Sequence, residues 1–240
     1  MPALSAQFVH PWRVPLDEAA AIQRRLAEHV HLAASGTRGR PGADIAATSR
    51  TAVGVDVAYA LDGTLAWAAA VAMDRRFRVL ETAVVEGEPD APYTRGYLAF
   101  REGRLTIEAL LALGIEPDVV FLDGHGVVHE RGLGLASHVG VLLDLRTVGV
   151  PKTPFHAIDR LPGPQRGDHY VLTKEWGAEG ASARLKAGVK PVYVSPGHLV
   201  DLPGALALAL AWSSGHHRVP EPLSAAHTLS VRARNAARLP

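Results

Sequence analysis

One stretch of sequence decides the fold: Thr51-Ala52-Val53-Gly54-Val55-Asp56-Val57-Ala58-Tyr59-Ala60. Valine and tyrosine side chains alternate there with small residues and one aspartate, and this period of two predicts a β-strand. The pair Asp62-Gly63 follows as a hairpin signal, so further strands are predicted at Thr64–Asp74 and Arg78–Glu86. The chain is therefore expected to begin its sheet as an antiparallel meander.

Beyond the meander, helical and strand patterns alternate, which predicts an α/β fold. We expect one mixed sheet, the antiparallel meander followed by parallel strands, flanked by helices. No repeat or flexible linker interrupts the chain, so residues 1–240 are expected to form a single domain, with 1–33 as an N-terminal helical segment. The other predicted elements are helices at Asp17–Leu32, Gly96–Leu113, Leu133–Leu145, after an N-cap at Asp201, and at Ala225–Ala237; strands at Asp118–Leu122, Thr147–Val150, Tyr170–Lys174, Ala183–Lys186 and Pro191–Ser195; and loops at Ser35–Asp44 and Leu161–Gly167.

The composition excludes several classes of protein. Hydrophobic residues make up 48% of the 240 residues, enough to bury a core, and there is no cysteine, so disulfides, thiolate zinc sites and a cysteine nucleophile are excluded. The net charge of +1 means that nucleic-acid binding would need basic residues gathered on one face. Residues Met1–His10 lack a signal-peptide pattern, and the longest apolar run, Ala205–Trp212, is too short for a membrane span. We expect a cytoplasmic monomer.

Three carboxylates occupy positions where a core or a strand end is predicted. Asp56 interrupts an apolar strand, Asp123 follows a buried strand, and Glu102 lies in the first turns of a helix. Each has an ordinary explanation: Asp56 on a solvent face, Asp123 in an Asp-Gly turn, Glu102 favoured by the helix dipole. If the three converge at one edge of the sheet, their hard oxygen ligands suit Mg²⁺, with Mn²⁺ as a substitute.

Two histidine and arginine patterns leave alternatives open. His125 and His129 are four residues apart, as in some zinc sites, but the flanking Gly124 and Gly126 disfavour a helix there and the glutamate of a zinc-hydrolase motif is absent. Arg234 and Arg238 share one helix face, which suits either phosphate contacts or a solvated surface.

The combination of motifs resembles the endonuclease V family, whose members are deoxyinosine 3′ endonucleases with a ribonuclease H-like fold. The resemblance extends from about residue 50 to 230 and rests on the order and spacing of several blocks. These blocks are Val53–Tyr59, Pro92-Tyr93-Thr94-Arg95-Gly96 running on to Glu102, Pro117–Gly126, His129-Glu130-Arg131, Gly134–Gly140, Gly149–Lys152, Ser195–His198 and Pro220–Pro222 leading to His227.

The resemblance implies a role for each matched residue. Asp56, Glu102 and Asp123 would hold a catalytic Mg²⁺, with His227 and Lys152 as further catalytic residues near the scissile phosphate. Tyr93 would belong to a wedge that separates the strands around the lesion. The other implied substrate-binding residues are Arg95, Gly96, Gly124, His125, Gly126, His129, Arg131, Ser137 and His138.

The sequence departs from the family pattern at three places. Arg95 replaces a wedge proline, so the rigidity of that residue is lost, although the arginine could add a phosphate contact. Glu130 replaces another proline, and Leu223-Ser224 follow Pro222 where the family has Thr-Arg.

The expected function is a DNA-repair endonuclease that uses Mg²⁺-activated water to cut on the 3′ side of deaminated bases in DNA. Two alternatives remain from the sequence. One is an endoribonuclease acting on inosine in RNA, since discrimination depends on contacts to the 2′-hydroxyl. The other is an inosine-binding protein with weak cleavage, suggested by the altered wedge and the missing arginine.

Overall fold

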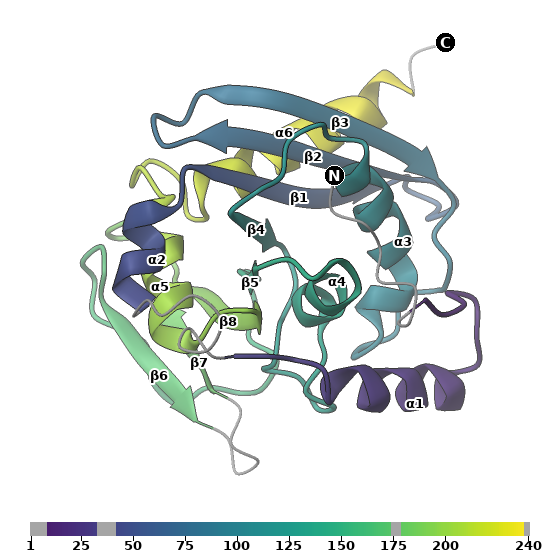
Figure 1. The fold of residues 1–240 in the computed structure, drawn as a ribbon, viewed down its shortest axis with the longest axis horizontal. Helices are drawn as coiled ribbons and strands as arrows, with labels where there is room; N and C mark the ends of the chain where they lie inside the picture. Colours follow the sequence, from purple (N-terminus) through teal and green to yellow (C-terminus); the bar gives the residue numbers. More distant parts are fainter. Residues whose placement is uncertain (1–8, 33–41, 174–178, 238–240) are drawn as a thin grey trace.

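The computed structural model describes residues 9–32, 42–173 and 179–237, and its elements form one mixed sheet with helices on both faces (Figure 1). The helices are α1 (Leu16–Ala27), α2 (Gly42–Thr48), α3 (Leu98–Leu111), α4 (Leu135–Leu143), α5 (Leu202–Ala211) and α6 (Glu221–Ala236). The strands are β1 (Thr51–Tyr59), β2 (Ala66–Asp74), β3 (Val79–Gly87), β4 (Val119–Leu122), β5 (Thr147–Gly149), β6 (His169–Thr173), β7 (Glu179–Ala183) and β8 (Val192–His198).

The strand order is β3-β2-β1-β4-β5-β8-β7-β6, which confirms the predicted mixed sheet. Strands β1, β2 and β3 form the antiparallel meander, and β4 then pairs in parallel with β1 and with β5. Beyond β5 the sheet is antiparallel again through β8, β7 and β6. The parallel strands therefore lie at the centre, where both faces are covered by helices.

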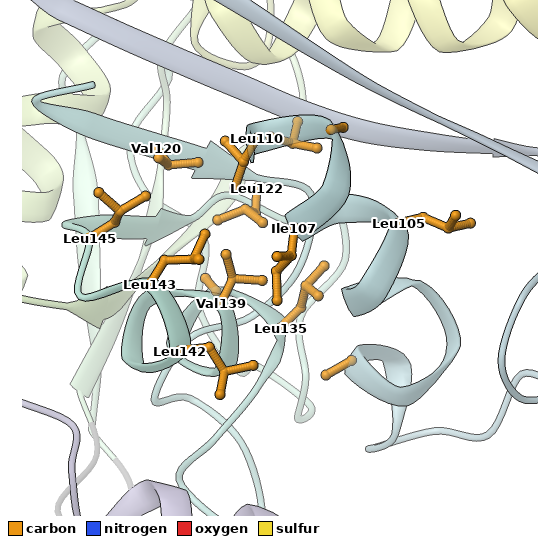
Figure 2. Close-up of a cluster of buried hydrophobic side chains, with 14 of the residues drawn as sticks. Leu105, Ile107, Leu110, Val120, Leu122, Leu135, Val139, Leu142, Leu143 and Leu145 are labelled. Atoms are coloured by element: carbon orange, nitrogen blue, oxygen red, sulfur yellow. The ribbon is translucent and has the colours of Figure 1, made fainter. Parts of the chain in front are cut away.

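Each face of the sheet carries its own apolar core. On one face, alternate residues of β1 and β2 pack against α3, α4 and α1, and on the other they pack against α5 and α6. Figure 2 shows apolar side chains of α3, α4 and β4 gathered in one cluster: Ile107 and Leu110 from α3, Leu135, Val139 and Leu143 from α4, and Leu122 from β4. Because β4 is apolar on both faces, it lies in the middle of the molecule and its polar successor, Asp123, marks the end of the core.

Three predicted boundaries are wrong for tertiary reasons. Helix α1 ends at Ala27, and the next residues instead contact the end of β8, where Leu199 N donates to His31 O at 2.7 Å. Strand β7 lies at Glu179–Ala183, not Ala183–Lys186, because its small residues pair with β6 and β8 despite weak strand preference. The loop predicted at Ser35–Asp44 overlaps α2, which begins at Gly42. Residues 35–41 of this loop, and Lys174 of the strand predicted at Tyr170–Lys174, lie outside the described residues.

The remaining elements match their predictions to within a few residues. Asp201 caps α5 as expected, since its side chain accepts a hydrogen bond from Gly204 N at 2.8 Å. Among the described residues, no helix combines the length and the apolar character that a bilayer span needs.

Helix α6 approaches β1 so closely that only glycine fits between them. A Cβ on Gly54 would lie 2.2 Å from both Leu223 N and Pro222 C, which are backbone atoms in the first turn of α6. Real Cβ atoms do not approach backbone so closely, so any side chain at this position would move the helix away from the strand. The glycine thus sets the distance at which the side chains of α6 meet those of β1.

We predict that Gly54→Ala destabilises the fold by about 1–3 kcal/mol, the usual cost of overpacking a core. Chemical denaturation followed by circular dichroism measures the loss. Gly114→Ala is the matched control, because a Cβ there comes no closer than 3.5 Å to its neighbours. Equal stability of the two variants would contradict the tight contact.

Candidate active site

The two aspartates lie next to each other across β1 and β4. Val55 pairs with Leu122 in the parallel register, so Asp56 and Asp123 follow as neighbours on adjacent strands. Pairing ends there because β4 ends at Leu122, whereas β1 continues to Tyr59. Asp123 therefore leaves the sheet beside the middle of β1, at the carboxyl end of a central strand, where ligands bind in open α/β sheets.

Asp56 is buried and is held by α6. Its Oδ2 accepts a hydrogen bond from Ser230 Oγ at 2.8 Å and lies 3.1 Å from His227 Nδ1. Burial is the main cause that raises the pKa of Asp56, followed by the charge of Asp123, while Ser230, His227 and Lys152 oppose the rise. Asp56 thus sits among the predicted catalytic residues and not on a solvent face.

Glu102 reaches the same region from the other face of the sheet. It is buried on α3, and Tyr59 OH donates to its Oε2 at 2.5 Å. Desolvation is the main cause that raises the pKa of Glu102 to about 8; the charges of Asp56 and Asp123 add to the rise, and the Tyr59 bond opposes it. Since β4 no longer covers the edge of β1 beyond Val55, carboxylates on the two faces influence each other there.

Two basic side chains border the carboxylates on the solvent side. Lys152 Nζ forms an ion pair with Asp123 Oδ2, and the lysine side chain is 38% exposed. His227, beside Asp56, is 54% exposed. Both groups can therefore meet an incoming ligand while they contact the acidic residues.

The donor set suits a hard divalent cation. It offers only carboxylate oxygens. Burial raises the pKa of both Asp56 and Glu102, the neighbouring carboxylate charges add to the rise, and a bound cation would offset the cost of keeping these groups ionised. Within the described ranges, no three histidines, aspartates or glutamates are grouped as ligands of one ion. Glu102 is hydrogen-bonded to Tyr59, and Asp123 forms an ion pair with Lys152. The chemistry fits the ion, and Asp56 with Asp123 forms the adjacent pair.

A cavity of about 200 Å³ opens beside Asp123. It brings together residues of the loop before α3 and of the segment after β4 that sequence analysis assigned to substrate, and it adds residues of the segment after β5 that sequence analysis did not assign. Its lining includes Tyr93, Arg95, Gly96, Asp123, Gly124, His125, His129, Thr153 and Phe155. Tyr93 is 69% exposed at this site.

The loop before α3 is fixed at Gly96. This glycine has φ +82°, in the left-handed region, and a Cβ on it would lie 2.4 Å from Glu130 Oε1. Its carbonyl oxygen accepts hydrogen bonds from Gln23 Nε2, His129 Nε2 and Arg131 NH2 at 3.0, 3.0 and 2.8 Å. His129 and Arg131 thus hold the loop at its base.

His125 lies in the wall of the cavity. Its Nε2 donates to Thr153 O at 3.1 Å, and its ring meets the ring of Phe155 edge-on. Burial lowers the pKa of His125 to about 4 and, together with the charge of Arg131, that of His129 to about 4. Both imidazoles are therefore neutral at pH 7.

Three of the expected substrate-binding residues are buried away from this cavity. Ser137 is fully buried and donates to Gly197 O at 2.9 Å. His138 is fully buried too, with its Nε2 at 2.7 Å from His10 Nε2, so substrate contact would require displacement of the N-terminal segment. Gly126 packs against β8, where a Cβ would lie 1.9 Å from Pro196 O. All three are packed against protein in this structure, and a substrate role for them stays a prediction.

Sequence analysis missed the residues that hold the carboxylates. Ser230 lies three residues after His227, so helical spacing places both on the face of α6 that meets Asp56 and could have indicated it. Tyr59 was assigned to the apolar face of β1, which is correct, but nothing in the pattern indicated its bond to Glu102. Phe155 carried no signal at all.

Comparisons with known proteins agree with this arrangement. The Endonuclease V family model matches residues 40–228. The chain is 38% identical over 233 residues to Endonuclease V of Kosmotoga olearia, covering 96% of this chain and 97% of that one. A crystal structure of Endonuclease V from Streptomyces avermitilis is 40% identical, with a TM-score of 0.83 and coverage of 95% and 96%. The Ciona intestinalis enzyme, crystallised with DNA containing an inosine followed by a ribo-adenosine, shares the fold at 24% identity, with a TM-score of 0.79 and coverage of 93% and 98%.

The sheet, the acidic site at the end of β4 and these matches define the chain as a nuclease. More narrowly, it belongs to the Endonuclease V family.

We predict that Glu102 makes the cation-free protein less stable as pH rises. Because the pKa of Glu102 in the fold, about 8, exceeds its ordinary 4.5, its contribution to stability is complete below pH 4.5 and is lost as pH approaches 8. In EDTA, Glu102→Gln should therefore raise the Tm by several degrees at pH 8.5 and by little at pH 5.

Glu108→Gln, an exposed change on the same helix, is the control for thermal unfolding. A pH-independent difference between Glu102→Gln and the unaltered protein would contradict the prediction.

Proposed function

We propose that this nuclease is a DNA-repair endonuclease that hydrolyses a phosphodiester on the 3′ side of a deaminated base, with deoxyinosine as the main lesion. The observation that carries the proposal is the placement of the Asp56–Asp123 pair beside a cavity lined by the wedge loop and by the loop after β4. The DNA bound by the Ciona relative contains inosine, which supports this choice of substrate.

We further propose that Asp56, Asp123 and Glu102 hold Mg²⁺, with Mn²⁺ as a substitute. When bound, such an ion supplies activation of water and neutralises charge that develops on the phosphodiester. The raised pKa values of Asp56 and Glu102 support the assignment, since they reflect carboxylates that are buried, first, and close to other negative charges, second, and both costs would be offset by a bound cation.

The chain's own residues would then divide the remaining work. His227, half exposed and hydrogen-bonded to Asp56, can hold or move a proton at Nδ1. Lys152, paired with Asp123, places a positive charge where phosphate oxygens gain negative charge. Tyr93 at the exposed wedge would separate the strands, and the cavity behind it would receive the extruded base.

The test is a nicking assay on an inosine-containing duplex and a matched control duplex, each with Mg²⁺ or with EDTA. We expect a cut on the 3′ side of inosine that requires Mg²⁺, and we expect Asp123→Asn to lower the rate by about 10²–10³. Glu108→Gln serves as the control variant. Cleavage that ignores the lesion, or that persists in EDTA, would refute the proposal.

The same assay on an inosine-containing RNA strand shows whether the protein cuts RNA faster than DNA. A binding assay that finds tight binding to the inosine duplex without cleavage would identify a protein that only recognises the lesion. Mg²⁺ should also raise the Tm of the unaltered protein and not that of Asp123→Asn, a readout independent of activity.

A further inference from the structure

The loop before α3, residues 91–96, is called the wedge loop here. Its Arg95 side chain contacts the segment after β5, which lines the same cavity. Its NH2 donates to Phe155 O, and its guanidinium lies over the Phe155 ring, 5.2 Å from the ring centroid. Arg95 belongs to the loop before α3, whereas Phe155 belongs to the segment after β5, so the contact joins segments sixty residues apart in the sequence. Both residues line the 200 Å³ cavity beside Asp123.

The Phe155 ring contacts two histidines that line the same cavity. It packs against His129 at 4.8 Å and against His125 at 5.4 Å between ring centroids. A second cavity, of about 320 Å³, is lined in part by residues of β6, β7 and β8, and it shares His125, Pro154 and Phe155 with the first. Phe155 therefore lines both cavities.

The other anchors of the wedge loop lie at its two ends. At the start of the loop, Arg101 NH1 of α3 donates to Ala91 O at 3.0 Å, and at its end, two residues before α3, the Gly96 carbonyl is held by His129 and Arg131. Between these points Tyr93 projects into solvent. Arg95, one residue before the anchored Gly96, joins the loop to the segment after β5 through a hydrogen bond and a cation–π contact.

We propose that Arg95 and Phe155 form a latch that holds the wedge loop against the far wall of the cavity, so that Arg95 is a positioning residue for recognition of the base. This inference rests on the proposed function and adds to it a residue that positions the loop for base recognition. Arg95 contacts neither the carboxylates nor Lys152 in its described bonds, so its removal should weaken recognition more than chemistry.

The chain offers a matched control for Arg95→Ala. Arg75 makes the same two kinds of contact far from the cavity: NH1 donates to Ala211 O at 3.2 Å, and the guanidinium lies 5.2 Å from the Trp212 ring centroid. Arg75→Ala therefore removes the same charge and similar contacts. Phe155→Leu keeps the carbonyl acceptor and removes only the ring.

The first experiment needs no nucleic acid. Hydrogen exchange of peptides that cover residues 91–100 should be about tenfold faster in Arg95→Ala than in the unaltered protein or Arg75→Ala, because a charge-assisted hydrogen bond and a cation–π contact are lost. Unchanged exchange would overturn the latch whether or not the protein cuts inosine-containing DNA.

The second experiment measures steady-state nicking of the inosine duplex. We expect Arg95→Ala to raise KM about tenfold with kcat within about threefold, and Phe155→Leu to have a smaller effect that does not add to that of Arg95→Ala. The preference for inosine over undamaged duplex should fall as well.

The alternative role for Arg95 is a direct contact with a phosphate. In that case Arg95→Ala should reduce the slope of log affinity against log salt concentration by about one, Arg95→Lys should keep the affinity of the unaltered protein, and Phe155→Leu should leave KM unchanged. This pattern would overturn the latch. If the unaltered protein fails to cut inosine duplexes, the proposed function fails while the exchange experiment still decides the latch.

Discussion

The close contact of α6 with β1 at Gly54 is the constraint on which the site depends. Because no side chain separates the first turn of the helix from the strand, the helix runs close enough for Ser230 and His227 to reach Asp56. A carboxylate buried in a strand is costly unless its oxygens find donors. The glycine thus permits the acidic centre two residues further along the same strand face.

The second constraint is the length of β4. The strand ends one residue before Asp123, so the edge of β1 is uncovered from Asp56 onward. At this point β4 no longer separates the two apolar cores on either face of the sheet. The charges of Asp56 and Asp123 therefore act on Glu102 of α3. A short strand in the centre of the sheet is what makes room for the site.

The sequence predicted the parts of this arrangement that depend on local pattern. The period of two in β1 and the Asp-Gly turn give the meander, and the polar residue after an apolar run gives the place of Asp123. The ends of α1 and β7 were wrong because bonds to distant strands decide them. The burial of Ser137 and His138 could not be predicted, because similarity of motif does not reveal burial. Tyr59, Ser230 and Phe155 act through contacts between segments far apart in the chain.

One further consequence follows from the carbonyl oxygen of Gly96. Three donors converge on it, and one of them, Gln23, comes from α1, which lies before the region matched by the family model. The same glutamine accepts a bond from Arg131 at 2.6 Å. The first helix is therefore part of the site's support: a fragment cut to residues 40–228 would keep Asp56, Glu102 and Asp123 and yet lose one of the three donors that fix the loop before α3.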